Sequence, residues 1–333
     1  MRIVDDTVAT AADLLQQRLG DGVRRDVALA PMTTYRVGGP ASLFVDVRGL
    51  DDLAAVAQVH RATGVPVLVV GRGSNMLVAD GGFDGVALSI AAFAGAIELP
   101  AMSGPQGTPC SVTAGGGVSL PVLARRTAAA GIAGFEWAVG VPGSIGGAVR
   151  MNAGGHGSDM AACVGDVDVF DLADHAGLTT IAADQLGLRF RASALAPLAV
   201  VVSARLRLGF GDRESSEREI AEIVRWRREH QPGGQNCGSV FVNPRPYEVS
   251  AGGLIDSLGL RGFRIGTAWV SEKHANFIQT SEGGSAADVR AVMEAVRTRV
   301  AEATGYQLRT EVRLVGFDDA DPTSFDDRLG DGE

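Results

Sequence analysis

The chain has little of what marks several classes of protein. Its 333 residues include three cysteines, Cys110, Cys163 and Cys237, and no C-x-x-C pair. An odd number of scattered cysteines cannot build a full disulfide framework, so we expect a reducing compartment.

The longest apolar run, residues 194 to 202, is interrupted by a proline and falls well short of the ~20 residues that a membrane helix needs. Residues 1 to 10 are acidic rather than basic, unlike a signal peptide. We therefore expect a cytoplasmic protein without membrane insertion.

Positive charge is also scarce. The formal net charge is −9, but residues 318 to 333 carry seven acids and one arginine, which leaves −3 for the rest of the chain. A body this close to neutral excludes nucleic acid as the expected partner, because phosphate binding draws on clustered Lys and Arg. The five histidines are scattered without metal-ligand spacing, so no metal is expected either.

Glycine, with 45 residues, is abundant instead. Between the glycines, apolar periodicity predicts mixed helices and strands. Helices are expected at residues 8–19, 51–63, 119–130, 216–230, 253–258 and 285–304, and strands at 41–47, 65–70, 86–90, 111–114, 164–172, 178–181, 200–208, around 266–279 and at 307–317. Ser216 and Glu219 have the spacing of a capping box that would open the fourth helix. A polar break near residue 211 predicts the main domain boundary.

Two glycine-rich loops stand out. One is Gly71-Arg72-Gly73-Ser74-Asn75, and the other runs from Val139 to Ala148 with four glycines in the eight residues 140–147. Successive glycine amides can point at one phosphate and form an anion-binding nest, although such loops are also ordinary tight turns. The Rossmann fingerprint is not met, since Met76 occupies the place of its third glycine, and no P-loop lysine follows. Two such loops could hold opposite sides of one long cofactor.

Six ordered motifs carry a resemblance to a known family. They are T-T-Y-R-V-G-G at 33–39, G-R-G-S-N at 71–75, the stretch 134–154, N-C-G-S-V-F-V-N-P at 236–244, V-S-E-K-H-A-N-F at 270–277 and T-E-V-R at 310–313. Together they resemble the UDP-N-acetylenolpyruvoylglucosamine reductase (MurB) family over residues 33 to 317. The region between Ser193 and Ser239 has no tyrosine, which resembles the type of this family without a tyrosine loop.

The resemblance implies an α+β protein in four segments. Residues 1–32 would form an N-terminal helix and lead-in, and residues 33–210 an FAD-binding domain of the vanillyl alcohol oxidase (PCMH) type. That domain would have two α/β subdomains, at about 33–92 and 93–210. Residues 211–317 would form a C-terminal α+β substrate-binding domain, and 318–333 an acidic disordered tail.

The resemblance also implies the reaction and the site. NADPH would reduce non-covalently bound FAD, and the enolpyruvyl group of UDP-N-acetylglucosamine enolpyruvate would then be reduced to give UDP-N-acetylmuramate for peptidoglycan, with the hydride passing from flavin N5 to C3. We expect a monomer. The implied cofactor-binding residues are Arg36, Gly71, Arg72, Gly73, Ser74, Asn75, Pro142, Gly143, Ser144, Ile145, Gly146, Gly147 and Asn152. The implied substrate-binding residues are Asn243, Lys273, His274 and Asn276.

Three residues are implied in catalysis. Ser239 would donate the proton to C2, an assignment that competes with an ordinary turn-capping serine. Arg191 would place a guanidinium on the developing enolate, with Arg189 as a rival for that role. Glu311 would act as an acid partner at the enolic carboxylate, although Arg309 and Arg313 beside it also fit a surface charge ladder. His156, which follows the second glycine loop, is interpreted as an exposed turn histidine rather than a flavin attachment point.

Two other functions remain open at this stage. Another FAD-dependent oxidoreductase or oxidase of the same superfamily would react quickly with oxygen and show no preference for an enolpyruvyl nucleotide. A non-catalytic relative that binds nucleotide sugars would fit the loose match around Arg191.

Overall fold

The computed structural model describes residues 2–174, 177–245 and 248–317, and the chain forms two compact units. Unit 1 comprises Met1–Arg25, Leu43–Arg72 and Asp84–Arg227, and unit 2 comprises Asp26–Ser42, Gly73–Phe83 and Arg228–Glu333. These units do not follow the segments expected from the sequence. Residues 26–42 and 73–83 pack with the C-terminal part, and most of the helix after residue 211 packs with unit 1. The expected tail, 318–333, lies outside the described residues.

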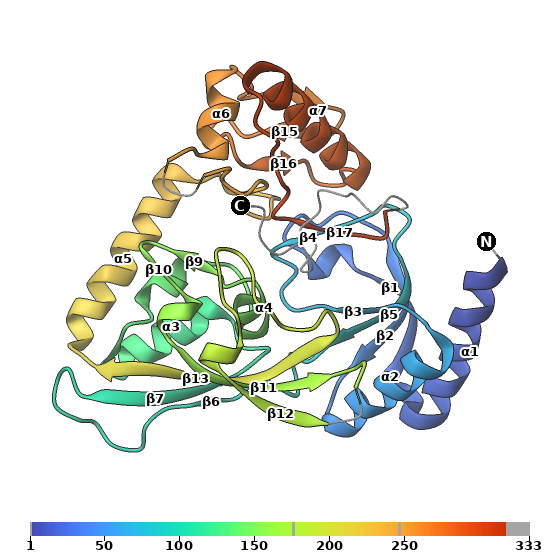
Figure 1. The fold of residues 1–333 in the computed structure, drawn as a ribbon, viewed down its shortest axis with the longest axis horizontal. Coiled ribbons are helices and arrows are strands. Elements are labelled where there is room, and N and C mark those ends of the chain that lie inside the picture. Colours follow the sequence, from blue (N-terminus) through green and yellow to red (C-terminus); the bar gives the residue numbers. More distant parts are fainter. Residues whose placement is uncertain (1, 175–176, 246–247, 318–333) are drawn as a thin grey trace. The chain divides into compact units, whose positions relative to one another are not determined.

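The first part of unit 1 is a sheet covered by two helices. Its strands are β1 (Val23–Ala28), β2 (Pro40–Asp46), β5 (Phe83–Ser89) and β3 (Val67–Val69), in the order β1-β2-β5-β3. Helices α1 (Arg2–Leu19) and α2 (Leu50–Thr63) lie side by side (Figure 1). Ala11, Ala12 and Leu15 of α1 are buried, as their helical spacing predicts. Helix α2 ends where Gly64 adopts a φ of 72°, a left-handed cap that suits glycine.

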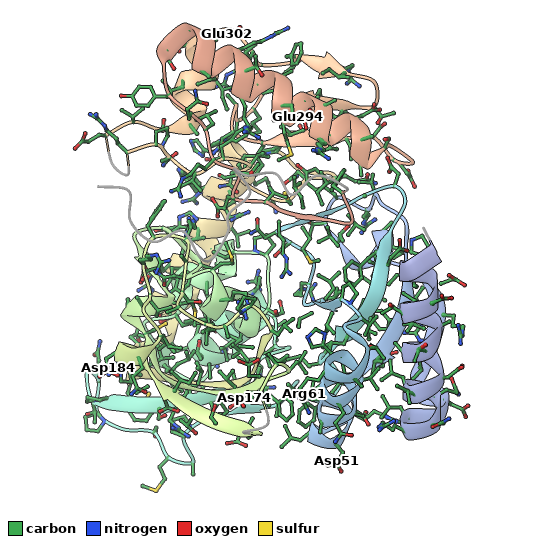
Figure 2. The ribbon with its side chains drawn as sticks, turned by 45° about the vertical axis from the view of Figure 1, so that its right-hand side comes forward. Asp51, Arg61, Asp174, Asp184, Glu294 and Glu302 are labelled. Carbon is green, nitrogen blue, oxygen red and sulfur yellow. The ribbon has the colours of Figure 1, made fainter. Side chains whose placement is uncertain are left out.

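The second part of unit 1 is a larger sheet, in the order β12-β11-β13-β7-β6 with β8 beside β13. Its strands are β6 (Ile97–Glu98), β7 (Pro109–Gly115), β8 (Ile132–Ala133), β11 (Val164–Asp171), β12 (Leu178–Ala182) and β13 (Ala199–Phe210). Helices α3 (Leu120–Ala129), α4 (Ile145–Arg150) and α5 (Arg213–His230) and the short hairpin β9 (Gly154–Gly155) and β10 (Ser158–Asp159) complete it. Arg61, in the last turn of α2, donates to the carbonyls of Leu172 and Asp174 and joins the two parts (Figure 2).

Unit 2 is built around the amphipathic helix α7 (Ala286–Thr304), whose apolar face is buried as predicted. It packs with the sheet β14 (Arg264–Ile265), β15 (Ala268–Val270) and β16 (Ile278–Thr280) and with α6 (Ala251–Ser257). A parallel pair, β4 (Met76–Val78) with β17 (Arg313–Val315), joins chain segments far apart in the sequence. None of the described helices is long and apolar enough to cross a membrane.

Two local predictions were wrong. Helix α5 begins at Arg213, and Asp212 rather than Ser216 accepts a bond from its first turn, through the amide of Ser215 at 2.9 Å. Ser216 lies inside the helix, where it is buried and donates to the carboxylate of Glu136. The expected strand 307–317 is regular only over Arg313–Val315. The predicted alternation persists in burial, with Leu308, Thr310 and Val312 buried, although among the described residues only one isolated bridge, between Thr310 and Phe241, precedes the regular strand.

The cap of α7 generates a prediction about stability. Asp80 accepts hydrogen bonds from Ser285 Oγ and from the amides of Ala286 and Ala287 at 2.7–3.0 Å. Burial raises the pKa of Asp80, but these hydrogen bonds outweigh it and lower the pKa overall. A carboxyl with a depressed folded pKa contributes stability above its unfolded pKa of about 3.9 and loses it as the pH falls through the folded value.

We expect Asp80→Ala to lower the free energy of unfolding at pH 7 by about 1 kcal/mol, the usual cost of removing a capping acceptor. The difference from the wild type should shrink as the pH falls below about 4, because the wild-type carboxylate loses its charge as the pH approaches its lowered pKa. Urea unfolding at pH 7, 4 and 2.5 measures this. Glu302→Ala, which changes an exposed acid on the same helix (Figure 2), is the control and should shift stability by less than about 0.5 kcal/mol. A pH-independent loss for Asp80→Ala would contradict the assignment.

Candidate functional site

The first glycine loop, residues 71–75, is a turn that is exposed at Gly71 and Arg72, and its shape depends on glycine. Gly73 has a φ of 57°, and a Cβ there would lie 2.2 Å from the carbonyl oxygen of Met32. The loop is held to the 33–39 motif by the amide of Thr34, which donates to the Gly73 carbonyl at 3.2 Å. Within the described part of the chain, the amides of residues 71 to 74 donate to no backbone carbonyl. Backbone donors at this turn are therefore available to an anion.

The second glycine loop meets the first inside unit 1. Ser144 caps α4 by accepting from the Gly147 amide at 3.4 Å, and its Oγ would lie 2.6 Å from a Cβ on Gly71. The two loops therefore touch each other at Gly71 and Ser144. The amides of Ile145 and Gly146, however, donate to the carbonyls of Val118 and Gly116 at 2.9 and 2.8 Å. These two amides anchor the loop to the end of β7 and are not free donors.

These loops fit the pyrophosphate of a dinucleotide. The Ser144 side chain fills the space that a Cβ on Gly71 would take, so the two loops pack closely only because residue 71 has no side chain. Arg72 on the first loop and Arg36 in the 33–39 motif are exposed, and neither has a carboxylate within ion-pair distance among the described residues. Both can supply positive charge to phosphates. No group of three or more His, Cys, Asp or Glu side chains that could hold a metal occurs in the residues described.

Unusual backbone conformations concentrate at predicted site residues. Among the described residues, five non-glycine residues have positive φ, namely Asp26, Arg36, Asn152, His156 and Arg191. Non-glycine residues seldom adopt this region, and such strain clusters at functional sites. Asn152 uses its side chain within the protein, because its amide nitrogen donates to Asp159 and to the Arg189 carbonyl, both at 3.2 Å, and its oxygen accepts from Ala161 at 2.9 Å. Its side chain thus shapes the loop from within.

The backbone around Arg191 separates it from its rival Arg189. Arg189 and Ala192 exchange two backbone hydrogen bonds of 3.0 Å, so Phe190 and Arg191 form the tip of a tight turn. The Arg191 guanidinium lies over the Phe190 ring and donates to the carbonyl of Gly154, just after the second glycine loop, at 3.2 Å. Arg191 therefore faces the loop region through its side chain. Arg189 does so only through its carbonyl, which Asn152 binds.

His156 is exposed, as interpreted from the sequence. Its ring packs on Gly140, where a Cβ would lie 3.0 Å away, and stands edge-on to Trp226 with centroids 5.1 Å apart. Burial and then the charge of Arg227 lower the pKa of His156.

Unit 2 contains a pocket of about 310 Å³ that gathers predicted residues from two motifs, 236–244 and 270–277. Ser239 and all four predicted substrate-binding residues line it: Asn243, Lys273, His274 and Asn276. The sequence did not single out the other polar lining residues, Ser250, Asp256 and Arg261. Arg261 forms a two-pronged ion pair with Asp256, at 2.5 and 2.9 Å, and also donates to the Glu272 carbonyl. Its sequence neighbourhood carries no pattern that distinguishes it from a surface arginine.

The pocket offers hydrogen-bond donors and positive charge. Lys273 and Arg261 are cations on its wall. Burial, followed by the charge of Arg261, lowers the pKa of His274, so its ring is neutral at pH 7. Its Nδ1 accepts from the Asn276 amide at 3.3 Å, and the proton of the neutral ring is therefore assigned to Nε2. Such a lining suits a ligand that carries phosphates and carbonyl or hydroxyl groups.

The turn that carries Ser239 is held on both sides. Asn276 is buried, and its carboxamide pairs with the backbone of Phe241 in both directions, at 3.0 and 2.9 Å. On the other side, the amide of Glu311 donates to the Val240 carbonyl at 2.8 Å. The structure thus brings Ser239 and Glu311 together in unit 2. The side chain of Asn276 is engaged with the backbone and positions the turn.

Cys237, two residues before Ser239, is buried and inert. Burial raises the pKa of its thiol to about 12, with the Glu311 charge adding to the shift against a contribution from Tyr35 that lowers it. A thiol that remains protonated is a poor nucleophile. Burial and then Cys237 raise the pKa of the Tyr35 phenol, which is fully buried.

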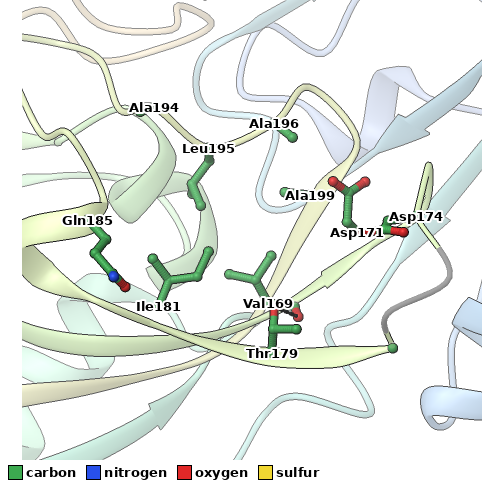
Figure 3. A pocket seen from close by; sticks show the side chains of 11 residues that line it. Val169, Asp171, Asp174, Thr179, Ile181, Gln185, Ala194, Leu195, Ala196 and Ala199 are labelled. Atoms are coloured by element: carbon green, nitrogen blue, oxygen red, sulfur yellow. Dashed lines mark hydrogen bonds between the residues drawn. The ribbon is translucent and has the colours of Figure 1, made fainter.

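Another pocket lies in unit 1 between β11, β12 and residues 194–199, with a volume of about 170 Å³ (Figure 3). Val169, Ile181 and Leu195 form its apolar wall, and Asp171 and Asp174 lie at one end. It contains none of the predicted site residues. The predicted chemistry therefore does not involve this pocket.

Comparisons with known proteins decide the family. Residues 41–177 match the model of an FAD-binding domain, and residues 230–315 match the model of the C-terminal domain of UDP-N-acetylenolpyruvoylglucosamine reductase. A UDP-N-acetylenolpyruvoylglucosamine reductase of Heliobacterium modesticaldum is 44% identical over 286 residues, which cover 85% of this chain and 88% of that protein. One from Synechococcus sp. strain WH7803 is 41% identical over 90% of this chain and 95% of its own length. The chain belongs to the UDP-N-acetylenolpyruvoylglucosamine reductase family.

A solved structure agrees with this membership. The crystal structure of the UDP-N-acetylenolpyruvylglucosamine reductase (MurB) from Thermus caldophilus superposes with a TM-score of 0.72 and 34% identity, over 88% of this chain and 99% of that one. The predicted α+β class and the FAD-binding domain are thereby confirmed. The glycine loop at 71–75 and the second loop fall within the FAD-binding match, and Ser239, the unit 2 pocket and Glu311 fall within the reductase match. The chain is thus an FAD-dependent oxidoreductase of this family.

The close packing at Gly73 generates a prediction about the cofactor. Gly73→Ala should destabilise the protein by more than about 1 kcal/mol, because alanine is strained at positive φ and its Cβ would displace the Met32 backbone. The purified variant should also lose bound flavin, measured as the ratio of absorbance near 450 nm to that at 280 nm. Gly81→Ala is the matched control, since a Cβ there meets nothing within 4 Å and the φ is not positive. Flavin content equal to the wild type in Gly73→Ala would count against a cofactor cradle at this turn.

Proposed function

We propose that the chain is the UDP-N-acetylmuramate dehydrogenase of peptidoglycan synthesis, which reduces UDP-N-acetylglucosamine enolpyruvate at the expense of NADPH. The observation that carries this proposal is the unit 2 pocket, where Ser239 and the cationic and neutral donors of the 270–277 motif share one wall. Such a pocket suits a nucleotide sugar, which presents a diphosphate and an acetamido group. FAD would be held by the glycine loops at 71–75 and 139–148, and it would supply hydride transfer from NADPH to C3 of the enolpyruvyl group.

Ser239 is proposed to donate the proton that completes the reduction at C2. A serine hydroxyl is a weak acid, so it can serve only a strongly basic carbon and only from a fixed position. The bonds from Asn276 to Phe241 and from Glu311 to Val240 supply that fixation. Because Gly238 has a φ of 84°, the turn leaves the hydroxyl at the pocket wall without bulk on the preceding residue.

Negative charge that develops on C2 and the adjoining carboxylate requires stabilisation. We propose that Arg191 supplies a guanidinium for this charge and that Glu311 acts as an acid at the same carboxylate. Arginine suits the first role because its planar group stays charged and binds a carboxylate through two bonds. The tight turn 189–192 supports Arg191 over Arg189, since it presents the Arg191 side chain toward Gly154.

An anaerobic absorbance experiment tests the function. Purified protein should show a flavin spectrum that bleaches with NADPH and returns when UDP-N-acetylglucosamine enolpyruvate is added. Flavin that bleaches but is reoxidised only by oxygen would instead identify an oxidase of the same superfamily. Protein that binds the nucleotide sugar without any flavin turnover would identify a non-catalytic relative.

The role of Ser239 makes a sharper prediction. Ser239→Ala should leave reduction of flavin by NADPH nearly unchanged and slow reoxidation by substrate by about 10²- to 10⁴-fold, the usual contribution of a positioned proton donor. Stopped-flow absorbance measures the two half-reactions separately. Ser257→Ala, on the outer part of α6, is the control and should change neither rate. Equal losses in both half-reactions of Ser239→Ala would refute the proton-donor assignment.

The two arginines can be separated in the same way. Arg191→Gln should slow reoxidation by about 10²-fold, the cost of removing one group that stabilises an oxyanion. Arg189→Gln should have an effect of less than about 3-fold, because only its carbonyl is engaged with the loop. The reverse ranking of the two variants would transfer the catalytic role to Arg189.

A further inference from the structure

Asn75, expected to bind the cofactor, uses its side chain elsewhere. Its carboxamide nitrogen donates to the carbonyl oxygen of Glu311 at 2.9 Å, across 236 positions of sequence. Its own backbone carbonyl accepts from the amide of Arg313 at 3.0 Å. Asn75 therefore binds the strand at two points, on either side of Val312.

Glu311 is held from its other side by the Ser239 turn. Its amide donates to the Val240 carbonyl at 2.8 Å, and the amide of Val242 donates to the Arg309 carbonyl at 2.9 Å. The two hydrogen bonds made by the Glu311 backbone lie on the two peptide groups that flank its Cα. Together they fix the orientation of both peptide planes, and this orientation sets the direction in which the Glu311 side chain leaves the backbone.

Asn75 contributes the one bond of this set that comes from a side chain, and it does so from an anchored position. Gly73 is locked against Met32 by its positive φ and by the 2.2 Å that would separate a Cβ from the Met32 oxygen. The Thr34 amide binds the Gly73 carbonyl on the same side. The Asn75 amide therefore ties Glu311 to a loop that is itself held against Met32 and Thr34.

We propose that Asn75 is a positioning residue that sets the geometry of Glu311 relative to the Ser239 turn and links it to the glycine loop. This inference rests on the proposed function, since it assigns Glu311 its role at the substrate carboxylate. Without the carboxamide, the Glu311 carbonyl loses the hydrogen bond from Asn75, and the backbone gains freedom at Glu311. Displacements of about 1 Å in such groups can slow a reaction by about 10²-fold.

The test uses a double-mutant cycle on the full-length holoenzyme. Asn75→Leu keeps the size of the side chain without a donor or a charge, and Glu311→Gln removes the acid. We expect Asn75→Leu to slow flavin reoxidation by substrate by about 10- to 100-fold while the rate of flavin reduction by NADPH stays within about 2-fold. In Glu311→Gln, adding Asn75→Leu should cause less than about a 3-fold further loss, because the two residues act as one unit.

Further variants separate positioning from cofactor binding and from folding. Ser74→Ala, in the same loop, should weaken flavin retention. Its fold loss in the reoxidation rate should multiply with that of Glu311→Gln. If Asn75→Leu does not fold, Asn75→Ala replaces it as the variant without a donor. Asn75→His, which restores a donor, should recover part of the reoxidation rate. Equal loss of both half-reactions in Asn75→Leu, or losses that multiply with those of Glu311→Gln, would overturn the inference. A wild-type flavin that substrate fails to reoxidise would instead overturn the proposed function.

Discussion

The backbone hydrogen bonds of residues 309–313 are the constraint on which the candidate site in unit 2 depends. This short stretch binds the Ser239 turn through Val240 and Val242, and it binds the glycine loop through Asn75. The three segments lie far apart in the sequence, and these hydrogen bonds set their positions relative to one another. Its alternating burial keeps Thr310 and Val312 in the core while Glu311 stays partly accessible. Buried and accessible side chains thus alternate along this stretch.

Close approach of backbone to backbone is the second organising feature. In unit 2, a Cβ on Gly38 would lie 2.4 Å from the Val78 carbonyl oxygen, and one on Gly39 would lie 2.4 Å from that of Asp80. The 33–39 motif is therefore locked against the segment that leads from the glycine loop to the cap of α7. Asp80 then holds the first turn of α7, so the loop and the main helix of the unit share one support. This close packing of backbone against backbone is one physical reason why the sequence contains so much glycine.

Local signals explain which predictions succeeded. Helices α2 and α7 end at glycines that adopt positive φ, and these ends were readable because only glycine takes that conformation at little cost. The capping box at Ser216 failed because a buried carboxylate, Glu136, recruits the serine hydroxyl from 80 positions away. The sequence offered the two glycine-rich stretches as opposite sides of one cofactor, but it indicated neither the contact between Gly71 and Ser144 nor the engagement of the Ile145 and Gly146 amides. These amides donate to the carbonyls of Val118 and Gly116, and no local sequence pattern indicates that those carbonyls lie nearby.

The amino-acid sequence by itself determined the family, the cofactor class and the identities of the residues that gather in the pocket, because motifs of fixed composition and order carry that information. The tertiary structure decided how those residues divide their work. It showed that Asn75, Asn152 and Asn276 use their side chains to hold backbone, and it added Arg261 and Asp256 to the pocket wall. The physical reason is that a carboxamide has the same donor and acceptor whether its partner is a ligand or a peptide group. Only the three-dimensional placement of a distant segment, such as residues 309–313, settles which of the two it meets.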